Sequence, residues 1–223
     1  MNQARWPGVQ RSALEALPAT TLLTGITCAT WLLAELFGGQ ALVTMSAGFV
    51  PATVLHPVGA PPGVFLLPFW ITPLTATLVH GGIVHLALNM VMLVVCGRML
   101  ERTIGTWGLV TLYAVGAYFA AAGQWALGAG SVVPMIGASG AISALVGAYA
   151  LLFANQPVPR LGPIPPRVVR IVWLLAGWVL IQLLIGFATI GGGPGIAIGA
   201  HIGGFIAGLA LARPLLLWRY RDA

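Results

Sequence analysis

The sequence predicts an all-α membrane protein, a bundle of six transmembrane helices with both termini in the cytoplasm. Of its 223 residues, 59% are hydrophobic and only 6% are charged, and the mean hydropathy is +0.97. Soluble globular domains contain about 45 to 50% apolar residues. This composition therefore places most of the chain in a hydrocarbon environment.

Apolar runs along the chain predict the individual spans. A hydrocarbon core of ~30 Å needs about 17 to 25 helical residues. Runs that meet or approach this length lie at 20–37, 79–97, 107–127, 139–155, 169–190 and 196–217. The first run follows charged residues without a clear cleavage site, so we expect it to be a retained span and not a removed signal peptide.

The distribution of positive charge predicts the orientation. All 10 basic residues are arginines. They form four groups: Arg5 and Arg11; Arg98 and Arg102; Arg160, Arg167 and Arg170; Arg213, Arg219 and Arg221. With six spans, every group lies on one side of the membrane, and that side is the cytoplasm by the positive-inside rule. The formal net charge of +6 could also suggest nucleic-acid binding. Because no soluble basic domain carries the charge, we expect no nucleic-acid partner.

The spans divide the chain into three regions. They are a cytoplasmic N-terminal segment at 1–19, the six-span core at 20–217 and a cytoplasmic tail at 218–223. Residues 38–78 form a long exterior loop rich in Pro and Gly. Its apolar end, with Phe69 and Trp70, could rest in the outer membrane interface or form an ordinary loop over the bundle. A second exterior loop, GGGPG at 191–195, is short and conformationally free.

Polar side chains within the spans are the candidate functional residues, because polar groups are costly in hydrocarbon. The candidates are His80, His85, Asn89, Ser139 and His201. The predicted topology places them all within roughly 10 Å of the exterior interface at ~1.5 Å of helix rise per residue. A single shared site would explain this common depth.

Each candidate also has a purely structural explanation. Ser139 could be a helix N-cap, and His201 could be a packed histidine bonded to a carbonyl. His85 and Asn89 are four residues apart and could hold helices together by hydrogen bonds. His80 would lie about 140° around the helix from His85, so we expect it to be a supporting residue.

The available side chains narrow the reaction class. The stretch HGGIVH at 80–85 has neither the spacing nor the glutamate of the zinc-binding HExxH motif. No pair of carboxylates lies in mid-span, since the acids are Glu15, Glu35, Glu101 and Asp222. A serine nucleophile with a histidine base is the catalytic arrangement that these two exclusions leave. We therefore expect a Ser139–His201 dyad with no cofactor and no metal, while Glu35 stays open as a carboxylate that orients the histidine.

Small residues make this dyad geometrically plausible. Gly204 and Gly208 recur at four-residue spacing in the last predicted span, and Gly140 begins a similar series in the fourth. Such spacing lets helix backbones approach closely. It would bring the His201 imidazole within reach of the Ser139 hydroxyl, although it would serve generic helix packing equally well.

Three motifs together resemble the rhomboid intramembrane serine proteases: HGGIVHLALNM at 80–90, GASG at 137–140 and AHIGGFIAG at 200–208. The GRMLE stretch at 97–101 and the long first loop resemble that family too, and the likeness runs from about residue 20 to the end of the chain. It implies a six-span rhomboid-like bundle.

The resemblance also implies residue roles. Ser139 would be the nucleophile and His201 the general base, and the oxyanion would be held by the Ser139 backbone N–H with the side chains of His85 and Asn89. Gly137 would let the backbone approach the scissile carbonyl. The implied substrates are other membrane proteins, cut in or near a transmembrane segment. The supporting residues are then Gly137, Gly140, His80, Gly204 and Gly208.

The chain departs from the family pattern at Ser143. Many members carry an aromatic residue at this position, four after the serine, where it stacks on the catalytic histidine. His201 must therefore be oriented by another group. The long loop also lacks the arginine that many members carry before the second span.

The expected setting is a bacterial plasma membrane, because the chain has no lysine and is rich in Ala, Gly and Arg. The site would open to the exterior side, with membrane lipid and transmembrane proteins as partners. The same residues suggest two other function classes. A non-catalytic rhomboid-like protein that binds membrane clients is the main alternative. A transporter is disfavoured, since the polar groups stop in the outer half of the membrane.

Overall fold

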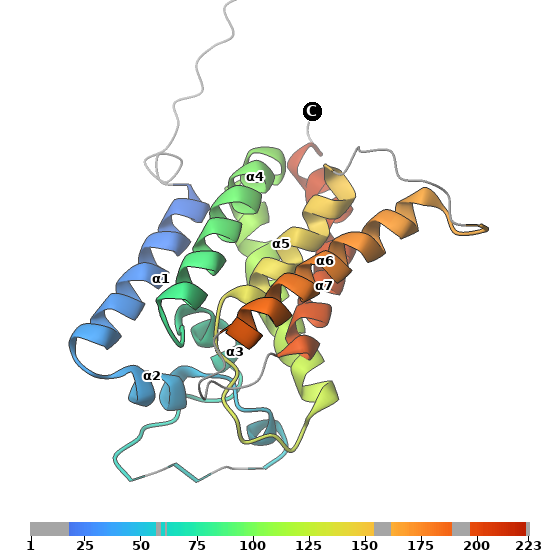
Figure 1. Cartoon of the computed structure of the whole chain (residues 1–223). Helices are drawn as coiled ribbons and strands as arrows, with labels where there is room; N and C mark the ends of the chain where they lie inside the picture. The colour runs from blue at the N-terminus through green and yellow to red at the C-terminus, as the bar shows by residue number, and fades with distance from the viewer. Residues whose placement is uncertain (1–17, 57–58, 61, 154–161, 189–196, 222–223) are drawn as a thin grey trace, which may run out of the picture.

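The computed structural model describes residues 18–56, 59–60, 62–153, 162–188 and 197–221 (Figure 1). Within these ranges the regular structure is helical, apart from isolated bridges such as that between Phe49 and Met135. The α-helices are α1 (Ala19–Leu36), α2 (Gln40–Ala47), α3 (Thr72–Thr75), α4 (Ile83–Leu127), α5 (Ser139–Leu152), α6 (Pro166–Ala188) and α7 (Ile198–Arg219), and the 3-10 helices are η1 (Pro51–Val54) and η2 (Ala76–Leu78). The predicted all-α class is confirmed.

Helix α4 is a hairpin of two legs. Its 45 residues cover the predicted run 79–97 from Ile83 onward and the whole of the predicted run 107–127, and Gly105 between the two has φ 79° and ψ 166°. A positive φ of this size favours glycine, which has no Cβ to clash with the backbone. The first leg packs on α1, where Gly97 faces Thr20, and the second leg packs on α7. Figure 1 shows the chain turning back on itself at this point.

The beginning of α4 corrects one prediction. The apolar run from residue 79 suggested a helix that included His80, but α4 begins at Ile83. Gly82 has φ 163° and ψ 166°, an extended conformation that leaves His80 ahead of the helix. The two glycines at 81 and 82 favour this because glycine is a poor helix former. The predicted position of His80, about 140° around a helix from His85, is therefore wrong.

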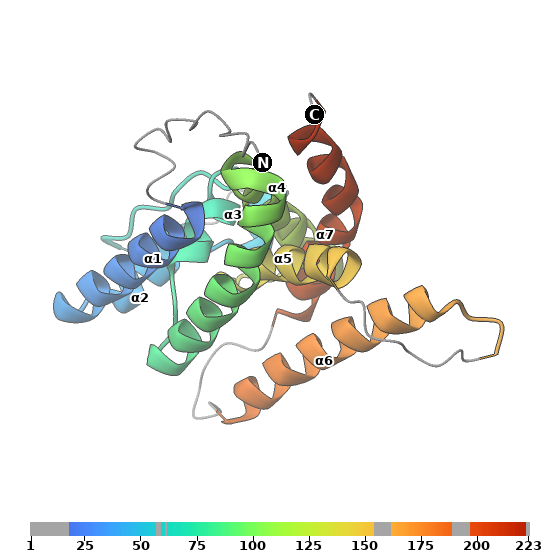
Figure 2. The ribbon, with the colours of Figure 1, turned by 90° about the horizontal axis from the view of Figure 1, so that it is seen from above.

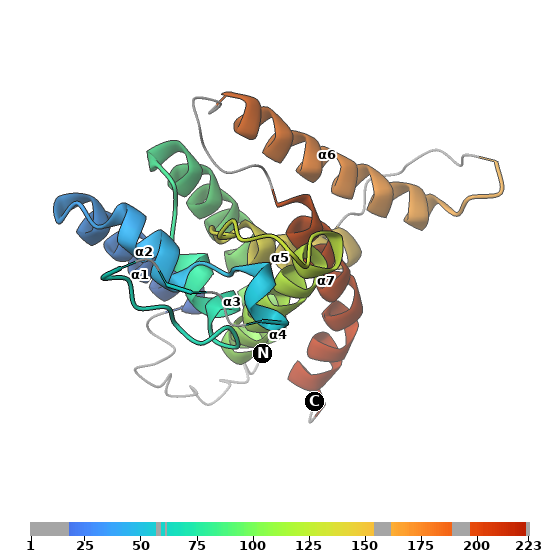
Figure 3. The ribbon, with the colours of Figure 1, turned by 90° about the horizontal axis from the view of Figure 1, so that it is seen from below.

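Helix α5 lies at the centre of the bundle. Its residues from Ser139 to Ala148 are all buried, and it packs closely on α4 and α7. Helix α1 covers the first leg of α4, while α6 lies outermost, against α5 and α7 (Figures 2 and 3). A helix that is apolar and buried all round, as α5 is, belongs to the core of a bundle.

The outer surface of the bundle is apolar. Leu33 on α1, Val91 on α4 and Trp173 on α6 are each more than half exposed, as suits side chains that face lipid. Three described helices, α1, α4 and α7, are long and apolar enough to cross a membrane. Two described apolar helical stretches are shorter, at Ser139–Leu152 and Val168–Leu180. The structure thus describes a membrane-embedded helical bundle.

Some sequence predictions fall outside the described residues. They concern the N-terminal segment up to residue 17, the GGGPG loop at 191–195 and the end of the tail at 222–223.

The described residues of the long loop at 38–78 include the short helices α2, η1, α3 and η2. It is hydrogen-bonded to the segment that leads into α5, since Met135 N–H donates to Phe49 O at 2.8 Å and Gly137 N–H to Ala76 O at 2.9 Å. At its end the side chains of Phe69 and Trp70 are exposed. The loop therefore lies over the end of the bundle where α5 begins.

At the other end of the first leg, Glu101 holds the start of α1. One carboxylate oxygen accepts hydrogen bonds from the backbone N–H of Ala19 at 2.5 Å and from Thr106 Oγ1 at 3.0 Å. The other accepts the backbone N–H and the hydroxyl of Thr20, at 3.1 and 2.7 Å. The first N–H groups of a helix have no partner within the helix, so this buried carboxylate caps α1 from a neighbouring helix.

We expect Glu101→Gln to lower the free energy of unfolding by about 1 to 3 kcal/mol, because an amide keeps only one acceptor oxygen for buried donors. Thermal unfolding in detergent micelles measures the change. The matched control is Glu35→Gln, since Glu35 is exposed and its carboxylate accepts only an exposed bond from Gln40 at 3.1 Å among the contacts described. That control should shift stability by less than ~0.5 kcal/mol. Equal shifts for the two variants would contradict the capping role.

Candidate active site

The two predicted dyad residues meet at the starts of α5 and α7. Ser139 is the first residue of α5, and His201 lies in the first turn of α7. Ser139 Oγ lies 2.9 Å from His201 Nε2, within hydrogen-bond distance. Both side chains are buried, at 8% and 3% exposure. The N-cap residue of α5 is Ala138, and Ser139 is the first residue inside the helix, so the N-cap explanation of Ser139 is wrong.

Glycines in α5 and α7 allow this approach. A Cβ at Gly204 would collide with the carbonyl oxygen of Gly140, and one at Gly208 with that of Ala144. The two backbones are thus in direct contact at the level of the dyad and one turn beyond it. The four-residue glycine spacing therefore predicted a real helix contact, in which Gly140, Gly204 and Gly208 allow the approach.

His85 and Asn89 face the turn that precedes Ser139. Gly137 in this turn has φ 107°, and a Cβ on it would lie 2.7 Å from His85 Nε2 and 3.9 Å from Asn89 Nδ2. Asn89 Nδ2 donates one hydrogen bond to the carbonyl oxygen of His85 at 2.9 Å, and an amide nitrogen has a second hydrogen to offer. Both side chains therefore converge on the backbone beside the serine, from one face of α4.

His80 also contacts the turn that precedes Ser139. Its Nε2 accepts a hydrogen bond from the backbone N–H of Ala138 at 3.4 Å. Its ring centroid lies 4.9 Å from that of His85, with the planes tilted by 59°. His80 is fully buried. It contacts both the serine turn and His85, although it lies outside the helix in which it was predicted.

The start of α5 supplies backbone donors at the same place. Gly137 N–H is bonded to Ala76 O and Ala138 N–H to His80 Nε2. The N–H groups from Ser139 onward belong to the first turn of α5, where no helical carbonyl precedes them. The positive end of the helix dipole also lies there. An oxygen that acquires negative charge beside Ser139 Oγ would therefore be stabilised.

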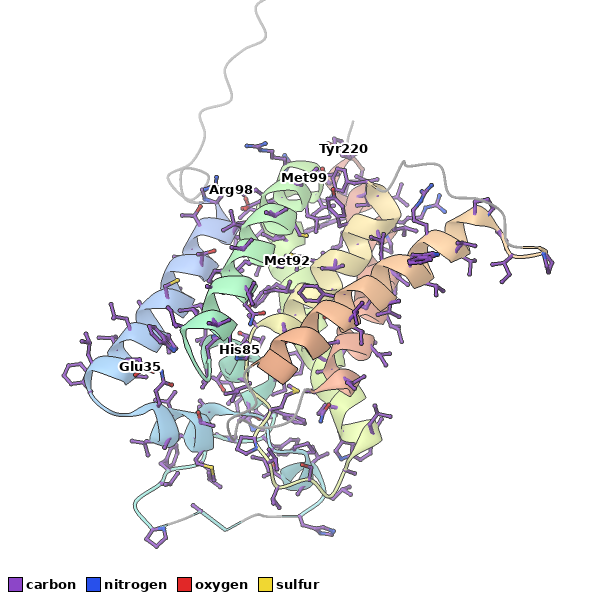
Figure 4. The ribbon with its side chains drawn as sticks, in the orientation of Figure 1. Glu35, His85, Met92, Arg98, Met99 and Tyr220 are labelled. Carbon is purple, nitrogen blue, oxygen red and sulfur yellow. The ribbon has the colours of Figure 1, made fainter. Side chains whose placement is uncertain are left out.

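The site lies at the end of the bundle away from the arginines of the first leg. Figure 4 shows His85 and Glu35 toward one end, and Arg98, Met99 and Tyr220 at the other. Glu101 lies near the arginine end, where it caps α1. Glu35 accepts a hydrogen bond from Gln40. Among the residues that the structure describes, no group of three His, Cys, Asp or Glu side chains is arranged to hold a metal ion.

The sequence did not single out Trp178, which the structure places beside the dyad. This residue of α6 is 4% exposed. Its ring contacts His201, and its indole N–H is bonded to Ser143. The departure at Ser143 showed that a support for His201 had to come from elsewhere. The sequence did not show which aromatic residue would supply it.

Comparisons with known proteins agree with the three motifs. A family model described as the Rhomboid domain matches residues 69–218. RHOMBOID-like protein 4 of Arabidopsis thaliana is 32% identical over 153 residues, which are 65% of this chain and 34% of the relative. Rhomboid protease GlpG of Serratia proteamaculans is 31% identical over 136 residues, 60% of this chain and 44% of the relative. Rhomboid protease GluP of Bacillus subtilis is 30% identical over 145 residues, 65% of this chain and 27% of the relative. The aligned part is less than half the length of each relative.

Proposed function

This chain belongs to the rhomboid family, and we propose that it is an intramembrane serine endopeptidase that cleaves transmembrane segments of other membrane proteins. The single observation that carries the proposal is the 2.9 Å separation of Ser139 Oγ and His201 Nε2. Both residues lie within the matched region at 69–218. A nucleophile within hydrogen-bond reach of a base is the arrangement that covalent catalysis requires.

The proposed reaction proceeds through an acyl-enzyme. His201 Nε2 accepts the hydroxyl proton as Ser139 Oγ attacks the scissile carbonyl. The tetrahedral oxyanion is held by the Ser139 backbone N–H together with the side chains of His85 and Asn89. The peptide C–N bond then breaks, and His201 returns the proton to the leaving amine. Water repeats the sequence on the ester, which releases the second product and restores the serine.

The proposed topology has six spans and cytoplasmic termini. The two legs of α4, together with α1, α5, α6 and α7, would supply the six spans. The arginines of the first leg mark the cytoplasmic side by the positive-inside rule. The site would then open to the exterior face of a bacterial plasma membrane. Its substrates would be membrane proteins that approach within the lipid.

We expect His85→Ala and Asn89→Ala each to lower kcat by about 10²- to 10³-fold, as the loss of one oxyanion donor does in other serine proteases. KM should change little, because these donors act on charge that develops in the transition state. Steady-state cleavage of a quenched fluorescent transmembrane peptide separates the two constants. His56→Ala is the control, since His56 is an exposed histidine of the long loop. A rise in KM with unchanged kcat would instead indicate a role in substrate binding.

Reconstitution in liposomes with a panel of single-span substrates tests the activity itself. Cleavage products are identified by mass spectrometry, which gives the position of the cut relative to the span. Products that require Ser139 and that end within or beside the span support the proposal. Stable association with the substrates and no cleavage by the wild type would overturn it. That outcome would favour the non-catalytic, client-binding alternative.

A further inference from the structure

Trp178 contacts His201 from a helix that carries neither dyad residue. The two ring centroids are 6.3 Å apart and the planes meet at 68°, an edge-to-face arrangement. This geometry is favourable for aromatic rings, because the positive edge of one faces the negative face of the other. Since His201 is also buried, the tryptophan ring is one of the groups packed against the imidazole.

The position of Trp178 is set by a chain of two hydrogen bonds. The indole N–H donates to Ser143 Oγ at 2.7 Å, and the Ser143 hydroxyl donates to the carbonyl oxygen of Ser139 at 2.7 Å. A hydroxyl can accept and donate at once, and linked hydrogen bonds strengthen one another in a low-dielectric interior. Ser143 is completely buried. The tryptophan is thus tied to the backbone of the residue that carries the nucleophile.

We propose that Trp178 is a positioning residue, held by Ser143, that keeps the His201 imidazole in the orientation in which Nε2 faces Ser139 Oγ. This inference rests on the proposed protease function. The two contacts of Trp178 join α5, which carries the serine, to α7, which carries the histidine. A side chain tied to both helices limits rotation of the imidazole about its χ angles.

Trp178 differs from most described side chains of α6 in its burial. Among the described side chains of α6, the buried apolar ones are Val169 and Trp178, whereas Val172, Trp173 and Leu180 are more than half exposed. Figures 2 and 3 show α6 lying outside the group formed by α4, α5 and α7. Trp178 is therefore the large side chain through which the described part of α6 reaches the dyad.

A purely structural role makes a different prediction. If Trp178 only anchored α6, its loss would lower stability and leave the reactivity of the remaining folded Ser139 unchanged. The test therefore uses two readouts on the full chain in liposomes. They are kcat and KM for a transmembrane peptide, and the rate at which a fluorophosphonate probe labels Ser139.

We expect Trp178→Ala to lower kcat and the labelling rate by about 10- to 100-fold, because a small misplacement of a catalytic group has effects of this size. KM should stay within about twofold, since the contact is not made to substrate.

Trp178→Phe keeps a ring beside His201 and should recover most of the loss. Its residual deficit should be about two- to tenfold, the effect of one hydrogen bond. Ser143→Ala should cost at least as much, because it removes both the bond from Trp178 and the bond to the Ser139 carbonyl oxygen. The double variant Trp178→Phe, Ser143→Ala should be no worse than Ser143→Ala alone, because Ser143→Ala already removes the bond that Trp178→Phe removes.

Trp173→Ala is the matched control, an exposed tryptophan five residues earlier on the same helix. Its kcat and labelling rate should equal those of the wild type. The inference is supported if labelling falls for Trp178→Ala, recovers for Trp178→Phe and tracks kcat at equal folded fraction. Full labelling and full kcat in folded Trp178→Ala would overturn it while leaving the protease proposal intact. A wild type that shows neither cleavage nor Ser139-dependent labelling would overturn the protease proposal, and this inference with it.

Discussion

Ser139→Ala is expected to abolish proteolysis in a protein that still folds. The hydroxyl is the proposed nucleophile, and alanine leaves His201 without a group to activate. Loss of a catalytic serine typically lowers kcat by at least ~10⁴-fold. Stability should change by only about 1 kcal/mol, the net effect of one lost hydrogen bond. Cleavage in liposomes, fluorophosphonate labelling and the thermal midpoint together measure these changes.

His201→Ala should have nearly the same effect, and the double variant should be no worse than either single variant. Residues that act as one unit in catalysis are strongly non-additive, because removal of one makes the other useless. Ser131→Ala is a suitable control, since Ser131 lies in the segment before α5 and its hydroxyl accepts only the backbone N–H of Val133 among the contacts described. Activity that survives Ser139→Ala would refute the proposed nucleophile. Activity that survives only His201→Ala would require another base.

Gly204→Ala is expected to have the largest effect on the fold. An added Cβ would collide with the carbonyl oxygen of Gly140 on α5, and that atom belongs to the backbone, so no side chain can move aside. We expect the free energy of unfolding to fall by about 3 kcal/mol or more through overpacking. Proteolysis should be lost as well, because separation of α5 from α7 lengthens the distance between Ser139 and His201.

Variants at two further glycines separate the loss of stability from the loss of the dyad geometry. Gly208→Ala should destabilise to a similar extent, since its Cβ would collide with the carbonyl oxygen of Ala144 one turn farther from the dyad. Gly25→Ala is the control, because no atom lies within 4 Å of its added Cβ. That variant should be neutral or slightly stabilising, as alanine is the better helix former. Thermal unfolding in detergent compares all three. If Gly204→Ala proved as stable as Gly25→Ala, the close contact of α5 and α7 would be wrong.

The approach of Ser139 and His201 could be anticipated because its cause is local in sequence. Small residues every four positions give a helix a flat face, and Gly140, Gly204 and Gly208 lie on such faces. The position of His80 could not be anticipated in the same way. The predicted span begins at residue 79, ahead of the helix that begins at Ile83, and hydropathy does not distinguish an extended buried segment from a helix.

The contact between Trp178 and His201 could not be predicted from the sequence at all. Helix α6 contains several large apolar residues, and its composition does not show which of them faces the dyad. That choice depends on the rotation and tilt of α6 against α5 and α7, which are set by packing over the whole interface. Ser143 showed only that a different support was needed.

The all-helical class, the membrane setting, the rhomboid family and the polar residues worth testing could all be predicted from the amino-acid sequence. These properties follow from composition, from the length of apolar runs and from short motifs, all of which are readable along one chain. The three-dimensional structure was needed to show that Ser139 Oγ and His201 Nε2 lie 2.9 Å apart. It was also needed to show that His80 precedes α4 and that Trp178 lies against His201. Those relations join residues from different helices, so they depend on how helix faces fit together and not on any one segment.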